Sequence, residues 1–159
     1  MKNTDCIVDK FTDTLAHKGI LIAQSKDINW IDHLISILPA KYPPSFMSLI
    51  TRYTFDEFTA DKISFFANHG SADSEELINA IPNDKFIFKT TITNGFLQFA
   101  LPSTGSYDPL CFDIRKRKNN KEYPVVRLDH EEILQFERIK IVEPLYSSLI
   151  EMMQAYVER

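Results

Sequence analysis

Acidic, basic and potential metal-binding residue types gather in two short stretches in the second half of the chain. Tyr107-Asp108, with Asp113 nearby, forms the first stretch, and Asp129-His130-Glu131-Glu132 forms the second. If the fold brought them together, they would supply a general acid, a general base and carboxylate ligands for a metal ion. Such a set would suit a hydrolase.

The same residues also fit purely structural roles. Pro109 follows Asp108, which indicates a loop whose carboxylate caps a turn. Asp129 can cap a helical turn that begins at His130. The chain has neither the Gly-x-Ser-x-Gly elbow of serine hydrolases nor the His-x-x-x-His spacing of zinc enzymes. We therefore expect no catalysis, no cofactor and no bound metal, and we keep a hydrolase that uses Asp108 and His130 as an alternative.

Charge is unevenly distributed along the chain. The net charge is −4, which disfavours a general nucleic-acid binder. Residues 56–84 carry seven acidic side chains and one lysine, whereas residues 110–127 carry six basic and two acidic side chains. This polarity favours an oriented encounter with another protein. Residues 115–121 have no interleaved aromatic side chain for base stacking, so we expect a solvated hairpin tip there and no direct nucleic-acid binding.

Cysteine content and hydropathy bear on where the protein works. Cys6 and Cys111 lie far apart and lack the spacing of a disulfide framework or a zinc site, which favours free thiols in a reducing compartment. No apolar run approaches the length of a membrane span, and the first residues do not resemble a leader. We expect a cytoplasmic protein with no membrane partner.

The apolar spacing predicts helices in both halves of the chain. Residues 4–18 predict a short helix, and residues 27–38 predict a helix with Asp27 as its N-cap. A third helix is expected after the corner at Pro43-Pro44, a fourth over residues 71–81, and a terminal helix from near Pro144.

Strands are predicted between and after these helices. The expected strands are residues 63–67, 86–88, 90–93, 96–101, 110–114 and 123–128, with a hairpin turn at Asn94-Gly95. This order predicts an α+β fold: a central, mostly antiparallel sheet with helices packed against it, a helical N-terminal part and a C-terminal helix. We expect a single domain over residues 27–159 and a less defined helical segment over residues 1–26. One core should hold the side chains of Phe99, Phe112, Val125 and Leu149.

Three stretches together resemble the SUKH superfamily, which includes yeast cell-wall-assembly regulators and bacterial immunity proteins. The first runs from Ile31-Asp32-His33-Leu34 through Leu38-Pro39-Ala40-Lys41-Tyr42-Pro43-Pro44-Ser45-Phe46 to Arg52-Tyr53. The second comprises Gly95-Phe96-Leu97-Gln98-Phe99-Ala100 and Gly105-Ser106-Tyr107-Asp108-Pro109-Leu110-Cys111-Phe112-Asp113, and the third is Tyr123-Pro124-Val125-Val126-Arg127-Leu128-Asp129-His130-Glu131-Glu132-Ile133. The resemblance covers about residues 27–157, and it departs from the family where many members have a glycine soon after Tyr53.

The resemblance implies a protein that neutralises a cognate bacterial toxin, such as a nuclease, by stoichiometric binding. On that hypothesis Asp73, Glu75 and Glu76 would mimic phosphate in a basic cleft, and Tyr107 and Asp108 would form an adaptable contact loop. A regulatory interaction module of the cell-wall-assembly type is a further alternative, because fold alone does not fix function.

Overall fold

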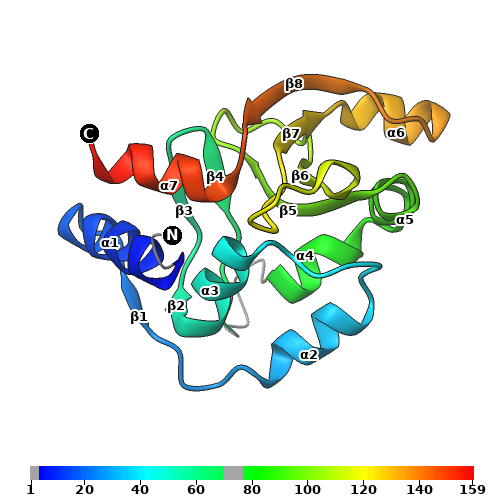
Figure 1. Cartoon of the computed structure of the whole chain (residues 1–159). Coiled ribbons are helices and arrows are strands. Elements are labelled where there is room, and N and C mark those ends of the chain that lie inside the picture. The colour runs from blue at the N-terminus through cyan, green and yellow to red at the C-terminus, as the bar shows by residue number, and fades with distance from the viewer. Residues whose placement is uncertain (1–3, 70–76) are drawn as a thin grey trace.

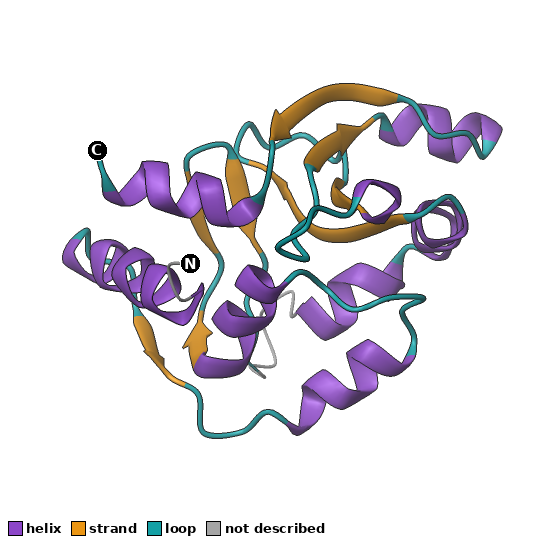
Figure 2. Ribbon diagram, viewed as in Figure 1, coloured by secondary structure: helices purple, strands orange, loops and turns teal. Residues whose placement is uncertain are grey.

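A computed structural model describes residues 4–69 and 77–159 of the chain. These residues form seven α-helices and two antiparallel sheets, which confirms the predicted α+β class. Figures 1 and 2 show the helices grouped around a larger sheet. The helices are α1 (Thr4–His17), α2 (Asn29–Ser36), α3 (Pro44–Arg52), α4 (Leu77–Asn83), α5 (Lys85–Thr93), α6 (His130–Phe136) and α7 (Leu149–Val157).

The larger sheet has six strands in the order β3-β4-β5-β6-β7-β8, so strands that pair in the sheet also follow one another in the sequence. Its strands are β3 (Phe58–Ala60), β4 (Ile63–Phe65), β5 (Phe96–Pro102), β6 (Leu110–Asp113), β7 (Val125–Leu128) and β8 (Ile141–Tyr146). A separate pair consists of β1 (Ile22–Gln24) and β2 (Tyr53–Phe55). A short 3-10 turn, η1 (Ile114–Lys116), follows β6.

Both faces of the larger sheet are buried, because alternate residues of a strand point to opposite sides. Phe99 and Phe112 stack with their ring centroids 4.1 Å apart on one face. Val125 and Leu149 join them in the main core, as the sequence predicts.

The other face carries a smaller core formed by β5, β6 and β7 with one residue each from α5 and α6. Its members are Ile87, Phe96, Cys111, Val126, Leu128 and Ile133. Cys111 lies in β6, within the strand predicted over residues 110–114, and is buried, whereas Cys6 is exposed.

Helix α1 belongs to the main core. Val8, Phe11 and Leu15 are fully buried, and the Phe11 ring meets the ring of Tyr156 in α7 edge-on at 5.4 Å. Figure 1 shows α1 and α7 side by side. Residues 1–26, which the sequence analysis sets apart from residues 27–159, therefore include a helix that is an integral part of the core.

The segment from residue 85 to residue 93 is a helix, so the prediction of strands at 86–88 and 90–93 is wrong. The carboxylate of Asp84 accepts hydrogen bonds from the backbone N–H groups of Phe86 and Ile87 and so caps α5. The buried side chains Ile87, Thr90 and Thr91 follow helical spacing.

Asn94-Gly95 consequently ends a helix and is not a hairpin turn. Gly95 has φ +83°, a left-handed conformation that is common just beyond a helix end. The chain then turns directly into β5, which begins at Phe96.

Two other predicted boundaries differ from the structure. Pro144 lies within the edge strand β8, where a missing N–H is tolerated, and the terminal helix begins at Leu149 after the N-cap Ser148. The N-cap position of α2 is Ile28, although the carboxylate of Asp27 accepts a hydrogen bond from the N–H of Asn29. The predicted helix over residues 71–81 is described only from Leu77, because residues 70–76 lie outside the described part of the chain.

Candidate binding cleft

A cleft of about 590 Å³ opens beside the smaller core. It lies between α4, α5, β5 and the start of α6, and its lining mixes apolar and polar side chains. This volume falls in the range of sites that hold small ligands or parts of larger ones.

Gln98 and Leu101 of β5 both line the cleft. Residues three apart in a regular strand point to opposite faces of the sheet. The register of β5 against β6 shifts between Gln98 and Ala100, and such a bulge reverses the alternation. The bulge therefore allows Gln98 and Leu101 to face the same cleft.

The backbone carbonyl of Gln98 has a hydrogen-bond partner within the fold, whereas its side-chain amide has none among the described residues. The Tyr42 hydroxyl donates a hydrogen bond of 2.8 Å to the Gln98 carbonyl oxygen. The Gln98 residue is only 9% exposed. Among residues 4–69 and 77–159, none hydrogen-bonds to its side-chain amide. The Gln98 side-chain amide is therefore open to whatever fills the cleft, either water or a polar group of a ligand.

The rim of the cleft offers an aromatic ring, an apolar side chain and two carboxylates. Tyr107 and Leu134 line the cleft with exposed fractions of 75% and 44%. Asp84 and Glu131 are its acidic members, and no lysine or arginine occurs among its described lining residues.

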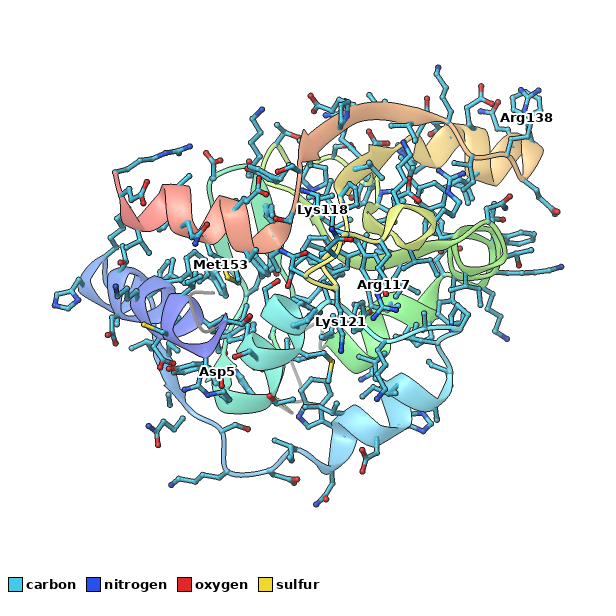
Figure 3. The ribbon with its side chains drawn as sticks, in the orientation of Figure 1. Asp5, Arg117, Lys118, Lys121, Arg138 and Met153 are labelled. Atoms are coloured by element: carbon cyan, nitrogen blue, oxygen red, sulfur yellow. The ribbon has the colours of Figure 1, made fainter. Side chains whose placement is uncertain are left out.

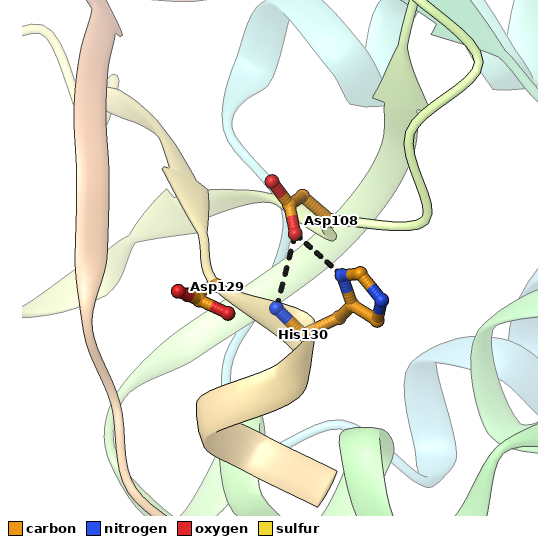
Figure 4. Close-up of side chains that lie close together, drawn as sticks. All are labelled: Asp108, Asp129 and His130. Carbon is orange, nitrogen blue, oxygen red and sulfur yellow. Dashed lines mark hydrogen bonds and ion pairs between the residues drawn. The ribbon is translucent and has the colours of Figure 1, made fainter.

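His130 lines the cleft at the N-terminus of α6 and is held there by Asp108. Oδ1 of Asp108 lies 2.6 Å from Nδ1 of His130 and accepts a 3.1 Å hydrogen bond from the His130 backbone N–H, as Figure 4 shows. The edge of the Tyr107 ring meets the imidazole with the centroids 6.2 Å apart.

The surroundings of Asp108 and His130 favour the charged form of each group. Burial alone would raise the pKa of Asp108, but the hydrogen bonds from His130 and the charge of Arg127 outweigh it and hold that pKa below its ordinary value. The hydrogen bond to Asp108 raises the pKa of His130 above its ordinary value. Nε of Arg127 lies 3.3 Å from Oδ2 of Asp108, so both oxygens of this carboxylate are engaged.

Asp129 caps the helix that carries His130. Its Oδ1 accepts hydrogen bonds from the backbone N–H groups of Glu131 and Glu132. Potential metal-ligand atoms of Asp108, Asp129 and His130 lie within 4.8 Å of one another. Because the hydrogen bonds of both carboxylates hold the start of α6, this geometry is explained by helix capping without a metal.

The structure places only some of the predicted site residues at the cleft. Tyr107 stands on the cleft rim, whereas the Asp108 side chain is 13% exposed and lies behind His130. Asp113, a member of the suggested hydrolase cluster, instead makes two hydrogen bonds with the Arg115 guanidinium. The predicted contact residues Asp73, Glu75 and Glu76 lie outside the described part of the chain.

Gln98 was missed by the sequence analysis. The signal that could have found it is a single amide within the otherwise apolar run Phe96-Leu97-Gln98-Phe99-Ala100-Leu101. A polar residue at the centre of a strand with two buried faces needs a partner or a function.

Residues 115–121 form a basic segment that begins within η1 and leads back towards β7. Figure 3 shows Arg117, Lys118 and Lys121 on this segment. Nζ of Lys118 lies 3.3 Å from Oε1 of Glu151 in α7, so one of these charges is paired within the fold.

Comparisons with protein-family models and with curated proteins find no match for this chain. Within the described residues, no helix has the length and apolar character needed to span a bilayer.

Proposed function

We propose that this chain is a cytoplasmic immunity protein that neutralises a cognate protein toxin by stoichiometric binding. The observation that carries the proposal is the exposed aromatic ring of Tyr107, which stands with Leu134 on the rim of a concave, partly acidic cleft. An aromatic anchor beside a cleft is typical of the few residues that dominate a protein interface.

The resemblance to the SUKH superfamily gives the proposal its direction. The confirmed α+β class agrees with what that resemblance implies. The polarised charge of the chain fits electrostatic steering towards a basic partner surface. A nuclease with a positively charged substrate cleft is the kind of toxin that this chemistry suits.

The test is neutralisation of the product of the adjacent open reading frame by co-expression, followed by binding of the two purified proteins. We expect Tyr107→Ala to weaken binding at least about tenfold, as the loss of an aromatic anchor does. Phe86→Ala is the matched control, because Phe86 is 60% exposed and does not line the cleft. Equal binding by both variants would contradict a role for the cleft rim, and growth arrest that this protein does not relieve would contradict the immunity function.

A hydrolase is the second candidate, because His130 lines the same cleft and its imidazole is paired with the carboxylate of Asp108 behind it, as in many general bases. The same co-expression assay separates the two functions. Protection that is lost with His130→Ala while toxin binding is retained would favour the hydrolase over the binding protein.

A further inference from the structure

We propose that the cleft is a subsite for one arginine side chain of the partner, with the Gln98 amide as its hydrogen-bonding floor. This inference rests on the proposed function for the identity of the partner. Its chemistry follows from the cleft itself.

Gln98 supplies the first step. Its side chain is nine-tenths buried, reaches the cleft and has no hydrogen-bond partner among the described residues. The side-chain oxygen of a glutamine accepts two hydrogen bonds. A ligand in the cleft that donates N–H groups could therefore bond to this oxygen in place of water.

The formal charges of the lining supply the second step. Asp84 and Glu131 bring carboxylates to the cleft without a lysine or arginine among the described lining residues. Asp84 uses Oδ1 for both of its capping bonds to α5, which leaves Oδ2 to accept from a ligand. Oε1 of Glu131 lies 3.1 Å from Nε2 of His130, which itself is paired with Asp108. His130 lines the cleft as well, but each of its ring nitrogens already faces a carboxylate, so the carboxylate of Asp84 favours a cationic ligand over an anionic one.

The apolar walls select arginine over lysine. Tyr107, Leu101 and Leu134 line the cleft together with these polar groups. A guanidinium is planar, stacks on aromatic rings and carries five N–H donors in fixed directions, so it can meet a wall, an amide oxygen and a carboxylate at once. The compact, strongly hydrated ammonium of lysine would lose more solvation in such a site.

The probe is N-acetyl-L-arginine N-methylamide, titrated into the isotope-labelled full chain at pH 8 and followed by NMR. We expect saturable shifts of the Gln98 side-chain NH₂ signals. The uncharged analogue N-acetyl-L-citrulline N-methylamide has nearly the same shape and should bind at least about fivefold more weakly. Equal shifts with both probes, or a silent Gln98, would overturn the subsite.

Matched charge variants on α6 and at its end supply the second readout. Glu131→Gln removes a carboxylate from the cleft and should weaken the arginine probe about two- to fivefold, as expected for an exposed ion pair. Glu137→Gln removes the same charge at the C-terminal end of α6, outside the cleft lining, and should leave binding unchanged. Equal effects of the two variants would also overturn the subsite. Gln98→Leu should abolish saturable binding, with its fold checked by the same spectra.

The subsite and the proposed function fail separately. Toxin neutralisation together with no binding of the arginine probe would refute the subsite and leave the immunity function standing. Saturable arginine binding by a protein that neutralises no toxin would refute the immunity function and leave the subsite standing.

Discussion

The Asp108 carboxylate links three structural elements through its two oxygens. One oxygen holds the imidazole and the backbone N–H of His130 at the start of α6, and the other faces Arg127 of β7. Arg127 in turn lies 3.4 Å from Glu143 of β8. Asp108 therefore positions the rim of the cleft from behind.

Asp108→Asn should destabilise the protein more at pH 5.5 than at pH 8.5. The pKa of His130 is raised, so its share of the stabilisation is present below its ordinary value of 6.5 and is lost as the pH rises through the raised value. The pKa of Asp108 is lowered, so its share is present above its ordinary value of 3.8. Between these limits both groups are charged. We therefore expect the loss of unfolding free energy caused by Asp108→Asn to be about 1 kcal/mol larger at pH 5.5 than at pH 8.5, as measured by urea unfolding.

Glu143→Gln is the control for this prediction. It removes the other carboxylate beside Arg127 without touching His130. Its effect on the free energy of unfolding should be the same at both pH values. An equal loss at both pH values for Asp108→Asn would show that the charge of His130 adds nothing to stability.

What the sequence predicts at this scale depends on how local the interaction is. The capping role of Asp129 is predicted and found, because a cap bonds to N–H groups two and three residues away. The contact between Asp108 and His130 joins residues 22 positions apart, so no spacing rule predicts it. Gln98 was overlooked because its meaning depends on the bulge that turns it towards the cleft.

At the scale of elements, the wrong prediction for α5 has a clear physical cause. The run Phe86-Ile87-Phe88 is apolar and rich in β-formers, and a short apolar run does not distinguish a strand from a buried helix. The cap at Asp84 and the glycine at the far end are helix signals that outweigh this composition. β8 was missed because Pro144 was taken as a helix start, although a proline also fits an edge strand.

Gly95→Ala should destabilise the protein more than Gly105→Ala. Both glycines have a left-handed backbone, with φ of +83° and +81°, so each substitution costs about 1 kcal/mol in strain. A Cβ at Gly95 would also lie 2.7 Å from Cγ of Arg115, whereas one at Gly105 would meet nothing within 4 Å. Arg115 cannot easily move aside, because its guanidinium is bound to Asp113 and lies 4.4 Å from the Phe96 ring centroid.

Thermal unfolding of the two alanine variants measures this difference. We expect Gly95→Ala to cost at least about 1 kcal/mol more than Gly105→Ala. Similar losses for the two variants would mean that Arg115 shifts without penalty and that the end of α5 is less tightly packed than the structure indicates.

At the scale of the whole molecule, the fold class was predictable but the arrangement was not. Consecutive apolar residues in β6 and β7 indicate strands with two buried faces, and the structure separates them as Phe112 and Val125 against Cys111 and Val126. The order of six strands depends on long-range pairing, for which one sequence offers no direct signal. The burial of α1 depends on its contact with α7, at the other end of the chain.

Partner association should depend on the acidic segment of the sequence, residues 56–84. Glu75→Lys with Glu76→Lys should lower the association rate roughly tenfold at low salt and flatten its salt dependence, because steering by opposite charges is lost. Lys116→Glu with Lys118→Glu should change the rate little, since Lys118 is already paired with Glu151. Surface-immobilised binding across a salt series measures both, with circular dichroism to verify folding. If only the lysine pair changes the rate, the partner docks beside η1.

The packing of α1 against α7 also constrains how the chain reaches its native state during synthesis. The α1 stripe of Val8, Phe11 and Leu15 leaves the ribosome long before α7 does, yet its burial includes contact with α7. α3 can cover part of α1 early, but the part of the apolar surface that α7 covers stays exposed until α7 emerges, and chaperones would recognise it. Closing the structure then requires a loop of almost the full chain, which makes the last step entropically costly and slow. The nascent protein is therefore most vulnerable to aggregation and proteolysis just before its final helix emerges.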